Sequence, residues 1–211
     1  MAKQKNRSGR PTKEDARDVK NDILNAAVDL FSQNGFQRVA IKDVTDKAGG
    51  SVGLVRHYFG TKDDLISATN DHVMRQLQAL FKAMYENLDF ENGEDLINRI
   101  QERTVNLLMP NVGLLFYFRR LIAELPDAAT KTFSAYHQLL QGHFERLDEL
   151  GFLAPDANKK WLAFELMFIQ LGPVLFSEQI EAITGKAAHD PQSVNERGKE
   201  TIRLMKAAIK H

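Results

Sequence analysis

The chain of 211 residues contains no cysteine, which excludes disulfide bonds and metal sites built from thiolates. It also carries no net charge, because 28 basic side chains balance 28 acidic ones. A neutral chain is not expected to coat nucleic acid as a polyelectrolyte. The absence of cysteine fits a reducing compartment, and we expect a cytoplasmic location.

Long apolar runs are missing as well. The N-terminus, MAKQKNRSGRPTKED, has no apolar stretch after its charges and so does not look like a secretory signal. The longest apolar run, residues 161–176, is interrupted by Glu165, Gln170 and the pair Gly172 and Pro173. It is shorter than the ~20 residues that cross a bilayer. We therefore expect a soluble protein with no membrane partner.

Patterns typical of catalysis and metal binding are also lacking. The sequence has no Ser-His-Asp arrangement, no glycine-rich phosphate loop and no paired carboxylates in a cleft-like context. His137 and His143 are six residues apart, and neither has a carboxylate at i+3 or i+4 to complete a ligand set. Glu165, in an apolar segment, is expected to make a buried or interface hydrogen bond. We expect neither enzyme activity nor a cofactor.

No segment alternates apolar and polar residues as a surface strand does, so we predict an all-α fold. An apolar stripe at helical spacing marks the first helix, formed by Ile23, Leu24, Ala27, Leu30 and Phe31. Gly35 is expected to end that helix, and Pro173 to kink a later one. The nine predicted helices cover residues 13–34, 41–48, 51–59, 61–87, 94–108, 112–125, 128–149, 157–183 and 193–209.

Charge is distributed unevenly along the neutral chain. Residues 1–65 hold 12 basic and 9 acidic side chains, whereas residues 66–211 hold 16 and 19. The first 13 residues hold five basic side chains and no acid. We interpret residues 1–12 as a flexible basic arm, in which Arg10 enters a DNA minor groove. A solvated tail without a partner explains the same residues equally well.

The stretch from Ile41 to Lys62 has the pattern of a helix-turn-helix. Ile41, Val44 and Ala48 recur on one face of a short helix. The pair Gly49 and Gly50 follows as a tight turn, and Ser51 is placed to cap a second short helix. Such a unit lays its second helix in the DNA major groove.

A longer set of residues resembles the signature of TetR/AcrR-type transcriptional repressors. The matching positions are Ser51, Gly53, Leu54, Val55, His57, Tyr58, Phe59, Thr61, Lys62 and Leu65, within a region of about residues 20–65. Gly50, Val52 and Arg56 depart from the family pattern. The resemblance implies a helix-turn-helix DNA-binding domain at 13–65 and an effector-binding and dimerisation domain at 66–211. It also implies a repressor that binds a palindromic operator as a homodimer and is released by a small, largely apolar effector.

The predicted DNA contacts centre on the second short helix, whose N-terminal part faces base edges and phosphates. Arg56 can contact guanine or a phosphate, and Tyr58 can either contact a phosphate or pack in the core. Gly53 is explained by a clash that a side chain would make with the preceding helix or with a DNA phosphate; an ordinary turn glycine remains the alternative. The full set is Arg10, Lys42, Thr45, Ser51, Val52, Gly53, Arg56, His57, Tyr58 and Lys62.

Aromatic side chains gather in the C-terminal part, and most of them are expected in the core. Interleaved polar groups also fit an apolar cavity with a few polar anchors, which in the family holds an effector. The predicted ligand-binding residues are Phe116, Arg119, Phe133, His137, Phe164 and Phe168. A DNA-binding regulator without ligand, and a helical protein that only binds small molecules, remain the alternatives.

The segment from Trp161 to Ile183 is apolar nearly all round and must be covered on more than one face. The last helix offers a single stripe, made by Ile202, Leu204, Met205, Ala208 and Ile209. Two copies of both helices, paired in a four-helix bundle, would cover this surface. The helix at 61–87 joins both parts, so we expect it to act as the lever by which an effector changes the spacing of the DNA-binding units.

Overall fold

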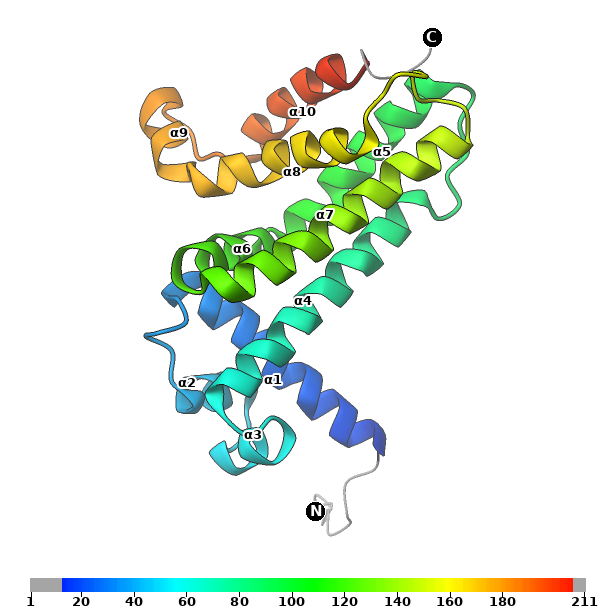
Figure 1. Ribbon diagram of the computed structural model, residues 1–211. Coiled ribbons are helices and arrows are strands. Elements are labelled where there is room, and N and C mark those ends of the chain that lie inside the picture. The colour runs from blue at the N-terminus through cyan, green and yellow to red at the C-terminus, as the bar shows by residue number, and fades with distance from the viewer. Residues whose placement is uncertain (1–12, 207–211) are drawn as a thin grey trace, which may run out of the picture.

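The computed structural model describes residues 13–206, which form ten α-helices and one 3-10 helix and contain no β-strand (Figure 1). The all-α prediction is confirmed. In chain order the elements are α1 (Lys13–Asn34), α2 (Ile41–Ala48), α3 (Val52–Tyr58), α4 (Lys62–Tyr85), α5 (Gly93–Leu108), η1 (Met109–Asn111), α6 (Gly113–Glu124), α7 (Pro126–Glu149), α8 (Lys159–Leu175), α9 (Ser177–Thr184) and α10 (Pro191–Lys206).

Helix α4 extends through most of the length of the molecule. Helices α1, α2 and α3 gather around its first turns, while α8 and α10 lie toward its far end (Figure 1). Its 24 residues span about 36 Å at 1.5 Å per residue. It contacts α1 at one end of the fold and α5 and α7 in the helical body. The same rigid element therefore belongs to both ends of the molecule.

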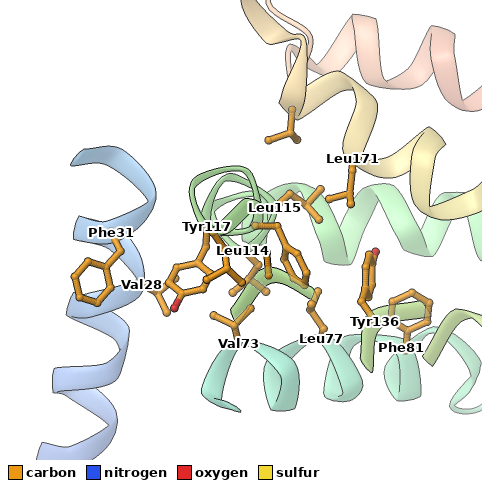
Figure 2. Packing of buried hydrophobic residues seen from close by; sticks show 14 of the residues in the cluster. Val28, Phe31, Val73, Leu77, Phe81, Leu114, Leu115, Tyr117, Tyr136 and Leu171 are labelled. Atoms are coloured by element: carbon orange, nitrogen blue, oxygen red, sulfur yellow. The ribbon is translucent and has the colours of Figure 1, made fainter. Parts of the chain in front are cut away.

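The apolar core is continuous from α1 to α8. Figure 2 shows Tyr117 of α6 facing Val28 and Phe31 of α1, next to the apolar residues of α4. The ring of Tyr117 is fully buried, and its hydroxyl donates to Asn70 Oδ1 on α4 at 2.6 Å. Burial raises the pKa of Tyr117, so the hydroxyl remains a donor. Helices α1, α4 and α6 thus meet around one side chain.

The prediction of one long helix at 157–183 is wrong, because this segment forms two helices, α8 and α9, which meet at Phe176. That residue has φ −109° and ψ 27° and so leaves the helical conformation. Pro173, where we expected a kink, lies inside the last turn of α8. Because proline has no backbone N–H, the carbonyl of Ile169, four residues earlier, receives no helical hydrogen bond from this position.

Some predictions fall on residues that the structure does not describe. They concern the arm at 1–12, which includes Arg10, and the side chains of Met205, Ala208 and Ile209 in the last apolar stripe. Within residues 13–206, no single helix is long and apolar enough to cross a membrane. Helices α8 and α9 meet that requirement only as a pair, across a bend of 72°.

Candidate nucleic-acid interface and ligand cavity

Helices α2 and α3 form the predicted helix-turn-helix around Gly49. This residue has φ 68°, the left-handed conformation that suits glycine. The N–H of Gly50 then donates to the carbonyl of Thr45 at 2.9 Å, which closes the turn. Val44 of α2 and Val55 of α3 are both fully buried. Each helix is therefore held by its apolar face, and the opposite face of α3 is left at the surface.

The predicted contact residues of α3 lie on this outward face. Ser51, Val52, Gly53, Arg56 and His57 are exposed. Ser51 occupies the N-cap position with extended backbone, although its hydroxyl makes no capping hydrogen bond. These five residues present a hydroxyl, a methyl-bearing side chain, a bare backbone, a guanidinium and an imidazole on one short helix.

Tyr58 lies at the edge of that face. Its side chain is half-buried, and its ring packs edge-on against His57 at 5.1 Å between centroids. Phe59 is half-buried beside it, with Lys20 Nζ 5.5 Å from the ring centroid. Tyr58 thus packs partly into the small core and keeps part of its ring at the surface, so the two roles predicted for it are compatible.

The structure corrects two predictions for this region: the DNA contact of Thr45 and the clash that a side chain at Gly53 would make with α2. Thr45 is buried, with 1% of its surface exposed, and its hydroxyl donates to the carbonyl of Lys42 at 2.8 Å. It has no accessible group for a DNA backbone, whereas Lys42 is exposed. A Cβ on Gly53 would meet only Ser51 Oγ, at an ordinary 3.7 Å. A clash with α2 therefore does not explain Gly53, and close approach of DNA remains a prediction.

The start of α4 is fixed beside α3 by a capping box. Thr61 Oγ1 accepts from the N–H of Asp64 at 3.2 Å, and the N–H of Thr61 donates to Asp64 Oδ2 at 3.0 Å. The hydroxyl of Thr61 also donates to Asp64 Oδ2, at 2.6 Å, and this bond together with the one from the Thr61 N–H holds the pKa of Asp64 below its usual value. Lys62 follows the cap, half-buried, with its Nζ 3.5 Å from the carbonyl oxygen of Gln37. An ammonium and a helix N-terminus thus lie together at the surface next to α3, an arrangement suited to a phosphate.

A polar contact between α1 and α6 was not predicted, and we call it the α1–α6 clamp. The carboxylate of Glu124 accepts from the backbone N–H of Phe36 at 2.8 Å and of Gln37 at 3.3 Å. Arg120, one turn earlier, donates to the carbonyl of Gln33 at 2.9 Å and lies 3.7 Å from Glu124. The clamp therefore holds the end of α1, and the turn that leads into α2, against α6. Phe36 and Glu124 are 88 residues apart in the sequence. Local sequence patterns therefore could not predict this hydrogen bond.

The six predicted ligand residues do not surround one cavity. Phe133, His137, Phe164 and Phe168 stack along the α7–α8 surface, with ring centroids of His137 and Phe164 4.0 Å apart. Phe168 is 52% exposed. His137 is satisfied by the carbonyl of Lys160, 3.0 Å from its Nε2. The number of rings predicts a pocket, whereas Phe168 is exposed, Phe133 and Phe164 are half-buried against the core, and His137 is buried.

Phe116 and Arg119 belong to a different environment. Arg119 lies over the ring of Phe116, 5.3 Å from its centroid, and donates to Ser177 Oγ at 3.2 Å. Phe116 lines a cavity. This space, which we call the α10 cavity, lies between α5, η1, α6, α8 and α10 and contains ≈ 640 Å³, part of it open to solvent. A second hollow, ≈ 830 Å³ and also partly open, lies between α4 and α7.

Arg197 of α10 also lines the α10 cavity. The apolar stripe of the last helix does not include this residue, so the sequence pattern does not predict its position. A lone arginine in a helix carries no signal by itself, because most such residues are solvated. Among the residues that the structure describes, no group of three or more histidine, aspartate or glutamate side chains could hold a metal ion.

Comparison with known proteins supplies the context for this geometry. The model of the bacterial regulatory proteins of the tetR family matches residues 23–69. The HTH-type transcriptional repressor Rv3405c of Mycobacterium tuberculosis is 35% identical over 163 residues, 77% of this chain and 76% of the relative. The HTH-type transcriptional regulator BetI of Brucella suis is 38% identical over 58 residues, 28% of this chain and 29% of the relative.

Solved structures show the same fold. A TetR transcriptional regulator from Chloroflexus aurantiacus superposes with a TM-score of 0.69 and 12% identity, covering 93% of this chain and 98% of that one. A TetR transcription regulator from Haloarcula marismortui gives 0.67 and 16%, with coverage of 92% and 100%. The likeness therefore extends over the helical body as well as over α1–α3.

Proposed function

Because the chain belongs to the TetR family of bacterial regulatory proteins, we propose that it is a repressor that binds a palindromic operator as a homodimer. Its place in this family makes it a helix-turn-helix transcriptional regulator and not an enzyme. The observation that carries the proposal is the outward face of α3, where Ser51, Arg56 and His57 are exposed while Val55 is fully buried. A regulator of this kind acts where the chromosome lies, in the cytoplasm.

The DNA contacts can be tested through Lys62. Its ammonium is expected to neutralise one phosphate, so Lys62→Ala should weaken binding to all DNA sequences and reduce the slope of log affinity against log salt by about 1. The matched control is Lys82→Ala, an exposed lysine of the same helix about 30 Å away along α4. A gel shift with DNA flanking the protein's own gene measures both. An unchanged salt slope for Lys62→Ala would remove this residue from the interface.

Arg56 addresses sequence preference instead of general affinity. An arginine that reads guanine contributes about 1–3 kcal/mol of discrimination against the wrong base. Arg56→Ala should therefore reduce the difference in affinity between the operator and unrelated DNA. A variant that lost affinity equally for both sequences would show that Arg56 contacts phosphate only.

The homodimer is supported by apolar side chains exposed at one end of the helical body. On α8, Trp161 is 58% and Phe168 52% exposed, and Phe176, just after it, is 59% exposed. Leu204 of α10 is 69% exposed. Trp161, Phe164 and Phe168 form a row of neighbouring rings along α8. Exposed apolar surface of this kind marks an interaction site, and a second copy related by a two-fold axis would cover it.

Sedimentation of a charged variant tests this dimer. Phe168→Arg would place two like charges across the interface and should yield monomers that bind DNA poorly. Ile122→Arg is the control, because Ile122 is also partly exposed, at 36%, but lies on α6. A dimeric Phe168→Arg protein would place the contact between copies elsewhere.

We further propose that a small, largely apolar effector binds in the α10 cavity and releases the DNA. The supporting observation is that α6 takes part in both regions: Phe116 lines the cavity, and Glu124 grips the turn between α1 and α2. A ligand that prefers one position of α6 would shift the population toward dimers whose α3 helices are wrongly spaced, with α4 as the lever. Equal DNA affinity with and without saturating effector would favour a ligand-independent regulator.

A further inference from the structure

The walls of the α10 cavity are mainly apolar. Val105, Met109, Leu115, Phe116, Ile169 and Val174 line it from α5, η1, α6 and α8. The cavity is partly open to solvent, so a ligand can enter it from outside. Walls of this kind suit a hydrocarbon portion of a ligand.

One guanidinium lies among these walls. Arg197 enters the cavity lining from α10, and no aspartate or glutamate is among the residues that line it. Within the described part of the chain, Arg197 has no carboxylate within ion-pair distance. Its Nη1 donates to the carbonyl of Ala188 at 2.9 Å. Burial lowers the pKa of Arg197, which means that the site penalises a charge that arginine nevertheless retains.

Several other arginines of the chain have partners that Arg197 lacks. Arg99, Arg146 and Arg203 each pair with a carboxylate of the same helix. Arg103 has no such partner, but it donates to the carbonyls of Ala83, Met84, Glu86 and Asn87 at the end of α4. The guanidinium of Arg197, with five N–H donors, has one such carbonyl. Its remaining donors suit an acceptor that comes from outside the chain.

The neighbouring polar groups also supply donors. Gln170 lines the cavity, and its Oε1 accepts from the hydroxyl of Tyr136, which leaves its amide N–H groups as donors. The hydroxyls of Thr104 and Thr201, also in the lining, already donate to helix carbonyls. The hydroxyls can therefore only accept, and the donors left for a ligand include those of the Gln170 amide and of Arg197, which supplies one full positive charge.

The backbone of α10 holds Arg197 close to α5. At Gly198 a Cβ would collide with the side-chain amide of Gln101 on α5, so the two helices approach closely at this point. The guanidinium is thus carried by a helix that packs directly on the cavity wall. Arginine is well suited to such a place because its planar fork binds a carboxylate through two parallel hydrogen bonds.

We propose that the α10 cavity binds a small amphipathic monocarboxylate, with its acid group on Arg197 and its hydrocarbon chain against the apolar walls. A single guanidinium neutralises one negative charge, and the apolar lining disfavours a dianion such as a phosphate ester. This inference rests on the proposed function only in taking this ligand to be the effector. The binding site itself is a property of the cavity.

Calorimetric titration of the full-length protein tests the site with butyrate, hexanoate and octanoate as probes. Hexanamide and 1-hexanol serve as neutral probes of matched length. Hexanoate or octanoate should bind at least tenfold more tightly than the neutral probes. If no carboxylate binds, or if hexanamide binds as tightly as hexanoate, the proposal is overturned.

Variants of α10 provide the second test. Arg197→Gln should lose at least tenfold in carboxylate affinity, and its ligand-free melting temperature should rise because a half-buried charge without a carboxylate partner has been removed. Arg203→Gln is the control, since Arg203 lies on the same helix, 74% exposed at its side chain, and should bind as the wild type does. Unchanged affinity in Arg197→Gln would refute the assignment. Should that variant not fold, Arg197→Lys keeps the charge but loses the fork and should still weaken binding.

Gel shifts separate this site from the proposed function. If hexanoate binds through Arg197 but DNA affinity does not change, the site stands and release by an effector is wrong. If the protein binds operator DNA and ignores every carboxylate, the regulator stands and this site is wrong.

Discussion

The α1–α6 clamp should make a measurable contribution to stability, and Glu124→Ala is the perturbation that isolates it. The carboxylate accepts a hydrogen bond from the N–H of Phe36 at 2.8 Å and a longer one, at 3.3 Å, from Gln37. Phe36 itself is buried, with 1% of its surface exposed. Truncation of Glu124 therefore leaves a backbone donor without its partner in a place that water reaches poorly.

The magnitude follows from these contacts. A hydrogen bond to a charged group contributes about 1.5–3 kcal/mol, which applies to the Phe36 contact. The ion pair with Arg120 spans 3.7 Å between side chains that are 33% and 22% exposed, so it adds less than about 1 kcal/mol. The total is about 3 kcal/mol. For a chain of this size, about 2–4 °C per kcal/mol gives a fall in melting temperature of about 6–12 °C.

Thermal unfolding followed by circular dichroism measures this change. Glu149→Ala is the control, because Glu149 pairs with Arg146 at 3.1 Å on the surface of α7 with 67% of its side chain exposed. That pair should contribute less than about 1 kcal/mol. Glu124→Gln keeps one acceptor oxygen and should fall between the two. Equal melting temperatures for Glu124→Ala and Glu149→Ala would refute the role assigned to the clamp.

Two further predictions concern pH and backbone conformation. Burial lowers the pKa of His143 from 6.5 to about 4. Between pH 4 and pH 6.5, His143 is therefore protonated in the unfolded chain and neutral in the folded chain. The contribution of His143 to the free energy of unfolding should be fully present above pH 6.5 and fall by up to about 3 kcal/mol toward pH 4. Urea titrations of His143→Gln at several pH values should lack this pH dependence. An identical pH dependence in the variant would assign the effect to other groups. Gly35 has φ 82°, and a Cβ there would collide with Glu124, so Gly35→Ala should lower stability by more than about 1 kcal/mol. Gly142→Ala, in open space within α7, should raise stability by about 0.4–1 kcal/mol, and a loss of similar size in both variants would contradict the clash.

The helices around the turn could be predicted from the sequence because local signals determine them. Gly35 ends α1 in the left-handed conformation, as expected, and Phe36 folds back so that its ring lies 4.9 Å from that of Phe31. Gly49 adopts the same conformation after α2. Thr61 caps α4 through its side chain. At each of these positions a residue acts on its own turn, so periodicity and capping preferences are sufficient.

Sequence patterns were not sufficient where a side chain acts on a distant element. Arg197 and Glu124 are ordinary charged residues of amphipathic helices until the fold places one against an apolar cavity and the other against the end of α1. Conversely, Phe164 and Phe168 suggested a pocket by their number alone, whereas Phe168 is exposed and Phe164 is half-buried against the core. Whether an aromatic side chain lines a cavity depends on which face of its helix the neighbouring helices cover, and that is a tertiary property.

Helix α6 connects the α10 cavity with the α1–α6 clamp. Phe116 at the α10 cavity and Glu124 in the clamp are about 12 Å apart along a single helix, with no break between them. A rigid helix that shifts at one end must shift at the other, so a ligand that displaces Phe116 would also strain the hydrogen bonds to the turn before α2. Because α4 and α6 both pack on α1, the position of α3 depends on two contacts and not on the lever alone. Loss of the clamp in Glu124→Ala should therefore weaken the effect of an effector on DNA affinity more than it weakens binding of the effector itself.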